Sequence, residues 1–143
     1  MNEKRKVLVW IFSPDDSGIS RFLVFKTIID RGGYWQPVTG SVESGETFEE
    51  GALRELKEET GFDGLGKLID LDFIFHYSAR GADVQEKCFG YFIQKLNKLP
   101  EPILEPKEHI EFKWVSEGEA SRMIKYDSNR SALAKIALFS ATS

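Results

Sequence analysis

The alternation of apolar and polar positions divides the chain into short strands and helices. Apolar runs rich in β-branched and aromatic residues are typical of buried strands, and they lie at residues 6–13, 21–27, 71–77, 87–94 and 111–115. Residues 14–18 have the composition of a turn, so the first two strands are expected to pair as a hairpin. Residues 34–39 form a further short extended segment that leads into a glycine-containing loop.

A helix is predicted directly after that loop, over residues 47–60. Thr47 and Glu50 have the spacing of a capping box, in which each side chain binds the backbone of the other residue. Gly61 follows the helix in the position of a C-terminal cap. Apolar residues at helical spacing predict the buried stripe: Phe48, Ala52, Leu53 and Leu56.

The order of the elements predicts one mixed sheet covered by helices. Strands come before and after the helix, and two further helical patterns follow at residues 116–123 and 131–139. Strand and helix segments mixed in this way favour an α/β architecture. The chain has 143 residues and contains neither an internal repeat nor a low-complexity segment. A single domain over residues 1–143 is therefore expected.

Composition narrows the class of protein. Hydrophobic residues at 41% and charged residues at 29% are typical of a soluble globular protein. The sequence has neither a run long enough to span a bilayer nor a convincing signal peptide, so a cytoplasmic location is expected. Cys88 is the only cysteine, which excludes an internal disulfide and argues against a cysteine-based zinc site. The sequence gives no indication of oligomeric state.

The net charge of −4, without a basic run, argues against a surface that binds duplex nucleic acid. A small, phosphate-rich substrate is still compatible with an acidic protein, because metal ions and a few local basic groups can neutralise phosphates.

Three carboxylates lie close together on the predicted helix. Glu55, Glu58 and Glu59 are spaced i, i+3 and i+4, so they are neighbours on the helix surface and repel one another. Mg²⁺ or Mn²⁺ would offset this repulsion, since hard cations prefer carboxylate oxygen and commonly bind together with phosphate. The alternative is a solvated, charged helix face. Gly51 argues against it, because a helical glycine costs about 1 kcal/mol relative to alanine and a closely approaching ion shell or loop would explain that cost.

The segment fits the pattern Gly-x5-Glu-x7-Arg-Glu-U-x-Glu-Glu-x-Gly-U, where U is apolar. The fixed positions are Gly40, Glu46, Arg54, Glu55, Leu56, Glu58, Glu59, Gly61 and Phe62. On these residues the chain resembles the Nudix hydrolases. The resemblance implies an α/β/α sandwich with a mixed β-sheet, and metal-dependent hydrolysis of a pyrophosphate linkage with Mg²⁺ or Mn²⁺.

The same resemblance implies roles for individual residues. Glu55 and Glu59 match metal ligands, and Glu58 matches a ligand or a proton acceptor. Arg54 is expected to pair with a nearby carboxylate such as Glu46 and to orient the helix. The predicted catalytic residues are therefore Glu58, Glu55 and Arg54.

Segments outside this motif resemble a folate-pathway branch of the family that acts on dihydroneopterin triphosphate. They lie at residues 35–43, 108–115 and 128–132. This resemblance implies release of pyrophosphate from a pterin triphosphate, or from a nucleoside triphosphate. It also implies that Glu108 is a further metal ligand; without the resemblance, Glu108 would be read as an exposed loop acid.

Four residues are candidates for contact with the substrate: Lys4, Lys26, Trp35 and Thr39. Each has an ordinary alternative, because single lysines are usually surface residues, a threonine can bond within its own turn, and aromatic residues in strands are usually core. The two histidines, His76 and His109, are expected to be bystanders.

Two other functions remain open. Within the enzyme class, the chain could hydrolyse dinucleoside polyphosphates or act as a nucleotide-housekeeping hydrolase. Outside it, the chain could be a non-catalytic module that binds a nucleotide. The complete set of glutamates argues against the second, since a binding module need not keep them all.

Overall fold

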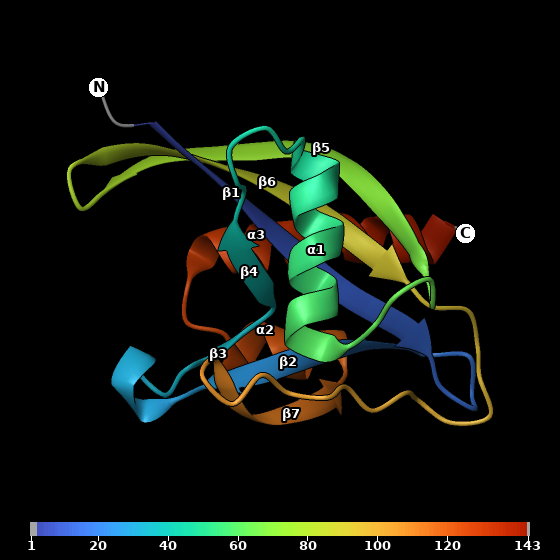
Figure 1. The fold of residues 1–143 in the computed structure, drawn as a ribbon. Helices are drawn as coiled ribbons and strands as arrows, with labels where there is room; N and C mark the ends of the chain where they lie inside the picture. Colours follow the sequence, from blue (N-terminus) through green and yellow to red (C-terminus); the bar gives the residue numbers. More distant parts are fainter. Residues whose placement is uncertain (1–2, 143) are drawn as a thin grey trace.

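The computed structural model describes residues 3–142, with side chains to residue 138. In this part of the chain, a seven-stranded mixed sheet lies between helices on its two faces (Figure 1). The strands are β1 (Glu3–Pro14), β2 (Ser20–Thr27), β3 (Trp35–Gln36), β4 (Val38–Ser41), β5 (Lys67–Ala79), β6 (Ala82–Phe92) and β7 (His109–Val115). The helices are α1 (Phe48–Thr60), α2 (Glu117–Met123) and α3 (Asp127–Thr142), with a short 3₁₀ turn at Ile29–Arg31. The predicted α/β/α sandwich is confirmed.

The first and last parts of β1 pair with different strands on one of its edges. Its strand order is β3-β2-β1-β6-β5, with β4 paired to β1 and β7 paired to β2. β1 and β6 are parallel, whereas the other pairs are antiparallel. β1 pairs with β2 only through its last residues, from Phe12 to Pro14, and with β4 through Lys6 to Val9. This division places β4, and the loop that follows it, beside α1 (Figure 1).

Alternate residues of β1 face the two halves of the core, as the pleat of a strand requires. Val7 and Val9 belong to one apolar cluster, which includes Ala52 and Leu56 of α1. Leu8, Trp10 and Phe12 belong to the other cluster, with members from α2 and α3. The buried Cys88 lies in this second cluster. Because β1 is buried on both faces, it reads in the sequence as a continuous apolar run rather than an alternating one.

Helix α1 begins and ends where the sequence predicts. The capping box of Thr47 and Glu50 is formed, and Gly61 adopts the left-handed conformation, with φ 77°. One position of the predicted stripe is wrong: Leu53 is 49% exposed. The helix turns about 100° per residue, so Leu53 points away from Ala52, while Glu59 and Thr60 complete the buried face.

The starts of β5 and α3 differ from those predicted. β5 begins at Lys67, four residues before the predicted start, and its register shifts between Asp70 and Phe73. Asp72 there has φ 55°, as in a β-bulge, which breaks the period-2 pattern. Helix α3 begins at Asp127 rather than 131, because Arg130 ties its first turn to the carbonyl oxygens of Ser121 and Ile124.

No helix in the described part of the chain is long and apolar enough to cross a membrane.

Candidate active site

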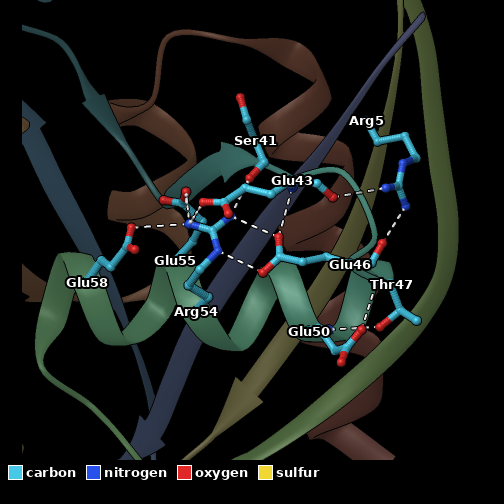
Figure 2. A network of polar contacts seen from close by, with 9 residues as sticks. All are labelled: Arg5, Ser41, Glu43, Glu46, Thr47, Glu50, Arg54, Glu55 and Glu58. Carbon is cyan, nitrogen blue, oxygen red and sulfur yellow. Dashed lines mark hydrogen bonds and ion pairs between the residues drawn. The ribbon is translucent and has the colours of Figure 1, made fainter.

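The guanidinium of Arg54 lies at the centre of a carboxylate network beside the glycine loop (Figure 2). It donates to both oxygens of Glu46, with Nε–Oε2 2.8 Å and Nη2–Oε1 3.1 Å. Nη1 donates to Glu55 at 3.0 Å and to Glu58 at 3.2 Å, and lies 3.4 Å from Glu43. The predicted pair of Arg54 and Glu46 is present. Its fork geometry suits arginine, whose planar group presents several donors at fixed angles.

The same network fixes the loop before α1. Arg54 Nη2 donates to the carbonyl oxygen of Ser41 at 2.7 Å, and the carboxylate of Glu46 accepts from the backbone N–H of Glu43 at 2.8 Å. From β1, Arg5 donates to the carbonyl oxygens of Glu43 and Glu46. Hydrogen bonding to Arg54 holds the pKa of Glu46 below its usual range and raises the pKa of Arg54. Both groups are therefore charged, and the loop is tied to two elements.

Two glycines allow the loop and the helix to meet closely. At Gly40, a Cβ atom would overlap the carboxyl end of Glu55. At Gly51, a Cβ atom would lie 3.0 Å from Val42 Cγ2 and 3.4 Å from Glu46 Oε1. The close approach of the loop therefore explains why the helix has a glycine at position 51.

Gly40→Ala is expected to displace the Glu55 carboxyl and to lower kcat/KM about a hundredfold, the scale of loss that follows a 1 Å misplacement in a reacting site. Gly118→Ala is the matched control, because a Cβ there would meet only Arg122 Nη1, at 3.4 Å. Steady-state kinetics on both variants measures the effect. Activity of Gly40→Ala equal to that of the control would show that the position of Glu55 against Gly40 does not matter.

Glu59 differs from the other glutamates of α1 because its side chain is buried, with the residue only 3% exposed. Its Oε1 atom has no hydrogen-bond partner. Burial raises the pKa of Glu59 well above its usual range, and the neighbouring Glu55 and Glu108 carboxyl groups raise it further, while Arg31 lowers it. Ionising a buried carboxyl group among acidic neighbours is costly, so a cation bound here would offset the cost of ionising Glu59.

Glu108 reaches the same region from the other side, just before β7. It forms a bidentate ion pair with Arg31, with Nη1–Oε2 2.9 Å and Nη2–Oε1 3.1 Å. Its charge contributes to the raised pKa of Glu59, so the fold brings Glu108 close to α1 from 49 residues further along the chain. The Arg31 partner was not foreseen, because nothing in the sequence links the turn at residues 29–31 to Glu108.

His109 was expected to be a bystander, and the structure places it next to Glu59. Its side chain is 0% exposed, and its Nδ1 atom lies 3.7 Å from Glu59 Oε1. Burial, aided by the charge of Arg31, lowers the pKa of His109 to about 4. In the sequence, only the position of His109 next to Glu108 indicates that it lies near the site. Its distance to Glu59 of α1 depends on where the fold places β7.

The donor set fits a hard divalent cation, because it consists of carboxylate oxygens. The carboxylates do not form a closed ligand set as they stand: within the described residues, no three carboxylate, imidazole or thiol groups gather closely enough to hold a metal ion. Arg54 holds the carboxylates of Glu55 and Glu58. The buried carboxyl group of Glu59, which has Glu55 and Glu108 as acidic neighbours, supports the fit.

The predicted substrate residues lie on the other face of the sheet. Thr39 pairs with Leu8, and Lys26 pairs with Trp35, and paired residues share a face. Leu8 and Trp35 both belong to the cluster opposite α1. Lys4 lies four residues before Leu8 on the same strand, and therefore also on that face. The fold thus brings the four substrate candidates to one face of the sheet, while α1, which carries Glu55, Glu58 and Glu59, lies on the other.

A polar group that the sequence did not reveal lies on the substrate side. Glu86 is 5% exposed, and burial raises its pKa, against the opposing effect of Lys6 and Tyr77. Burial, with the charge of Glu86, raises the pKa of Tyr77 to about 12. The pattern of β6 could not identify Glu86, because polar residues in a hairpin strand are usually solvent-facing.

Comparison with known proteins identifies the family. The NUDIX domain family matches residues 3–136, and the chain belongs to that family. It is a Nudix hydrolase, a pyrophosphohydrolase of small phosphorylated substrates, and members of this family generally use divalent metal ions.

Individual members of the family resemble the chain over most of its length. A Haemophilus influenzae protein named dihydroneopterin triphosphate diphosphatase is 31% identical, over 92% of this chain and 85% of that protein. The solved structure of the Escherichia coli dihydroneopterin triphosphate pyrophosphohydrolase superposes with a TM-score of 0.78 at 28% identity, covering 97% of this chain and 99% of that one. A Caenorhabditis elegans asymmetrical bis(5'-nucleosyl)-tetraphosphatase is 31% identical, over 74% of this chain and 75% of that protein.

Proposed function

We propose that this protein hydrolyses dihydroneopterin triphosphate to the monophosphate and pyrophosphate, with Mg²⁺ as its metal and Mn²⁺ as a substitute. The proposal depends chiefly on the buried carboxyl group of Glu59, which lies among the acidic groups of Glu55 and Glu108. The substrate rests on the similarity to dihydroneopterin triphosphate diphosphatase, which extends over 92% of the chain.

The proposed ligands are the carboxylates of Glu55, Glu58, Glu59 and Glu108. Bound divalent ions neutralise phosphate oxygens and lower the pKa of a coordinated water. The protein's own part is to position these carboxylates. Gly40 admits Glu55 against the loop, and Arg54 fixes the loop to α1 through Glu46. Arg54 is thus a positioning residue in this proposal.

Proton transfer is assigned to Glu58. In the hydrolysis, a water oxygen bonds to one phosphorus of the linkage, the bond from that phosphorus to the bridging oxygen breaks, and the water proton passes to a carboxylate. The Glu58 side chain is 56% exposed, compared with 15% for Glu55. An exposed carboxylate can return its proton to solvent after each turnover, which a buried one such as Glu59 cannot do directly.

Lys4, Lys26, Trp35 and Thr39 are proposed to contact the substrate from their shared side of the sheet. The lysines offer charge to the phosphates, and Trp35 offers a flat apolar face for the pterin ring. Lys113 already lies over this indole, with Nζ 5.4 Å from the ring centroid.

The single domain over residues 1–143, the cytoplasmic location and the lack of a duplex-binding surface stay predictions from the sequence.

A dinucleoside polyphosphate is the second candidate substrate, because the C. elegans tetraphosphatase is also 31% identical. Measuring kcat/KM with Mg²⁺ on dihydroneopterin triphosphate, diadenosine tetraphosphate and nucleoside triphosphates separates the candidates. We expect the pterin to be preferred at least about tenfold, which is about 1.4 kcal/mol in transition-state binding. A preference for the tetraphosphate would replace the proposed substrate. Saturable binding without metal-stimulated product would indicate a non-catalytic module.

A further inference from the structure

His109 connects the acidic site to the sheet through buried polar contacts. Its Nε2 atom lies 3.2 Å from the side-chain Nε2 of Gln36, and its Nδ1 atom lies 3.7 Å from Glu59 Oε1. All three side chains are buried, with residue exposures of 8% for Gln36, 1% for His109 and 3% for Glu59. They come from β3, β7 and α1, so the contacts join α1 to two strands of the sheet.

The Gln36 amide is oriented with its nitrogen toward the ring, and this orientation sets which ring nitrogen of His109 carries the proton. The Nε2 group of a glutamine is a donor only, so the ring nitrogen facing it must be an acceptor. The proton of the neutral ring is therefore on Nδ1, on the side that faces Glu59. The ring itself is held in place by Phe25, whose ring centroid lies 5.1 Å away.

Glu59 Oε1 and His109 Nδ1 are the two buried side-chain polar atoms without a hydrogen-bond partner in the described residues. Buried polar atoms are nearly always paired, and these two face each other at less than 1 Å beyond hydrogen-bond range. A small movement of the Glu59 carboxylate would satisfy both. Outer groups that hydrogen-bond a metal ligand orient it, and their loss typically costs 10–100-fold in metal affinity.

We propose that His109 is a positioning residue for Glu59: Gln36 keeps it in the Nδ1–H tautomer, and Nδ1–H donates to Glu59 Oε1 so that the other carboxylate oxygen is directed toward the divalent cation. This inference rests on the proposed role of Glu59 as a metal ligand. It adds Gln36 and His109 to a site whose other members lie on α1 and before β7.

Nitrogen NMR of the ¹⁵N-labelled wild-type protein tests the tautomer without any substitution. The chain has two histidines, and His76 is exposed on β5, so it serves as the internal reference. We expect the His109 ring to show the Nδ1–H tautomer, with Nε2 in the chemical-shift range of an unprotonated acceptor. The Nε2–H tautomer, or a doubly protonated ring, at pH 7 would overturn the proposal.

Calorimetric titration of the metal-free protein with Mn²⁺ tests the positioning. His109→Leu removes the donor and is expected to weaken Mn²⁺ binding about 10- to 100-fold. His109→Asn keeps an N–H near the place of Nδ1 and is expected to restore most of the affinity. His76→Leu is the matched control and should bind as the wild type does. A purely packing role predicts the reverse order, because leucine fills an apolar site next to Phe25 better than asparagine.

Glu59→Gln separates this inference from the proposed function. If Glu59→Gln loses Mn²⁺ affinity while His109→Leu keeps it, His109 has no positioning role and the proposed site still stands. If Glu59→Gln binds Mn²⁺ as the wild type does, Glu59 is not a ligand, and both the site and the role of His109 are overturned.

Discussion

Glu59→Gln is expected to lower kcat about a thousandfold while the protein stays folded. A bound metal ion contributes several kcal/mol of transition-state charge stabilisation, and each 1.36 kcal/mol is a factor of ten in rate. Glutamine has nearly the shape of glutamate but is a poor ligand for a hard cation. Because Glu59 is buried, solvent cannot replace its carboxylate. Steady-state kinetics with saturating Mg²⁺ measures the loss.

The fold should tolerate this substitution. Glutamine is neutral, so burial costs it less than it costs a carboxylate, and thermal unfolding of the metal-free variant should occur at the wild-type temperature or above. Glu49→Gln is the control, since Glu49 is exposed in the first turn of the same helix, and it should leave kcat unchanged. Near-normal turnover of Glu59→Gln would remove Glu59 from the site.

Arg54→Lys is expected to lower both activity and stability, although it keeps the positive charge. A lysine cannot reproduce the two contacts to Glu46 together with the bond to the Ser41 carbonyl oxygen. Hydrogen bonds to charged groups contribute about 1.5–3 kcal/mol each. The Arg54 side chain is 23% exposed, so solvent reduces the sum, and a loss of about 2 kcal/mol in the free energy of unfolding is expected.

The loss of kcat/KM in Arg54→Lys should be larger, about a hundredfold, because the loop and Glu55 shift together. Urea unfolding and kinetics on the same samples measure the two effects. Arg122→Lys, at an exposed position on α2, is the matched control and should change neither. An Arg54→Lys variant as stable as the control would show that the guanidinium network does not hold the loop.

Local signals predicted the elements well where a residue's neighbours in sequence decide its structure. The capping box, Gly61 and the apolar run of β1 depend on adjacent residues, and all three were predicted. The early starts of β5 and α3 depend instead on a bulge at Asp72 and on the contacts of Arg130 with the end of α2. Such tertiary contacts leave no local pattern.

In the candidate site, too, local spacing predicted some of the residues and tertiary packing placed the others. Helical spacing was enough to group Glu55, Glu58 and Glu59, and resemblance added Glu108. The pairing of β7 with β2 places Arg31 next to Glu108, and only the tertiary fold places His109 next to Glu59. The burial of Glu59 also could not be predicted, since a glutamate in a helix is usually exposed.

Metal-dependent release of pyrophosphate is the reaction that the carboxylates of α1 are proposed to support. Its most direct test follows the products of dihydroneopterin triphosphate as Mg²⁺ is added to the metal-free wild-type protein. We expect pyrophosphate and dihydroneopterin monophosphate in equal amounts, with turnover that rises with Mg²⁺ and is absent in excess chelator. Release of single phosphates, or the same turnover with and without the metal, would contradict it.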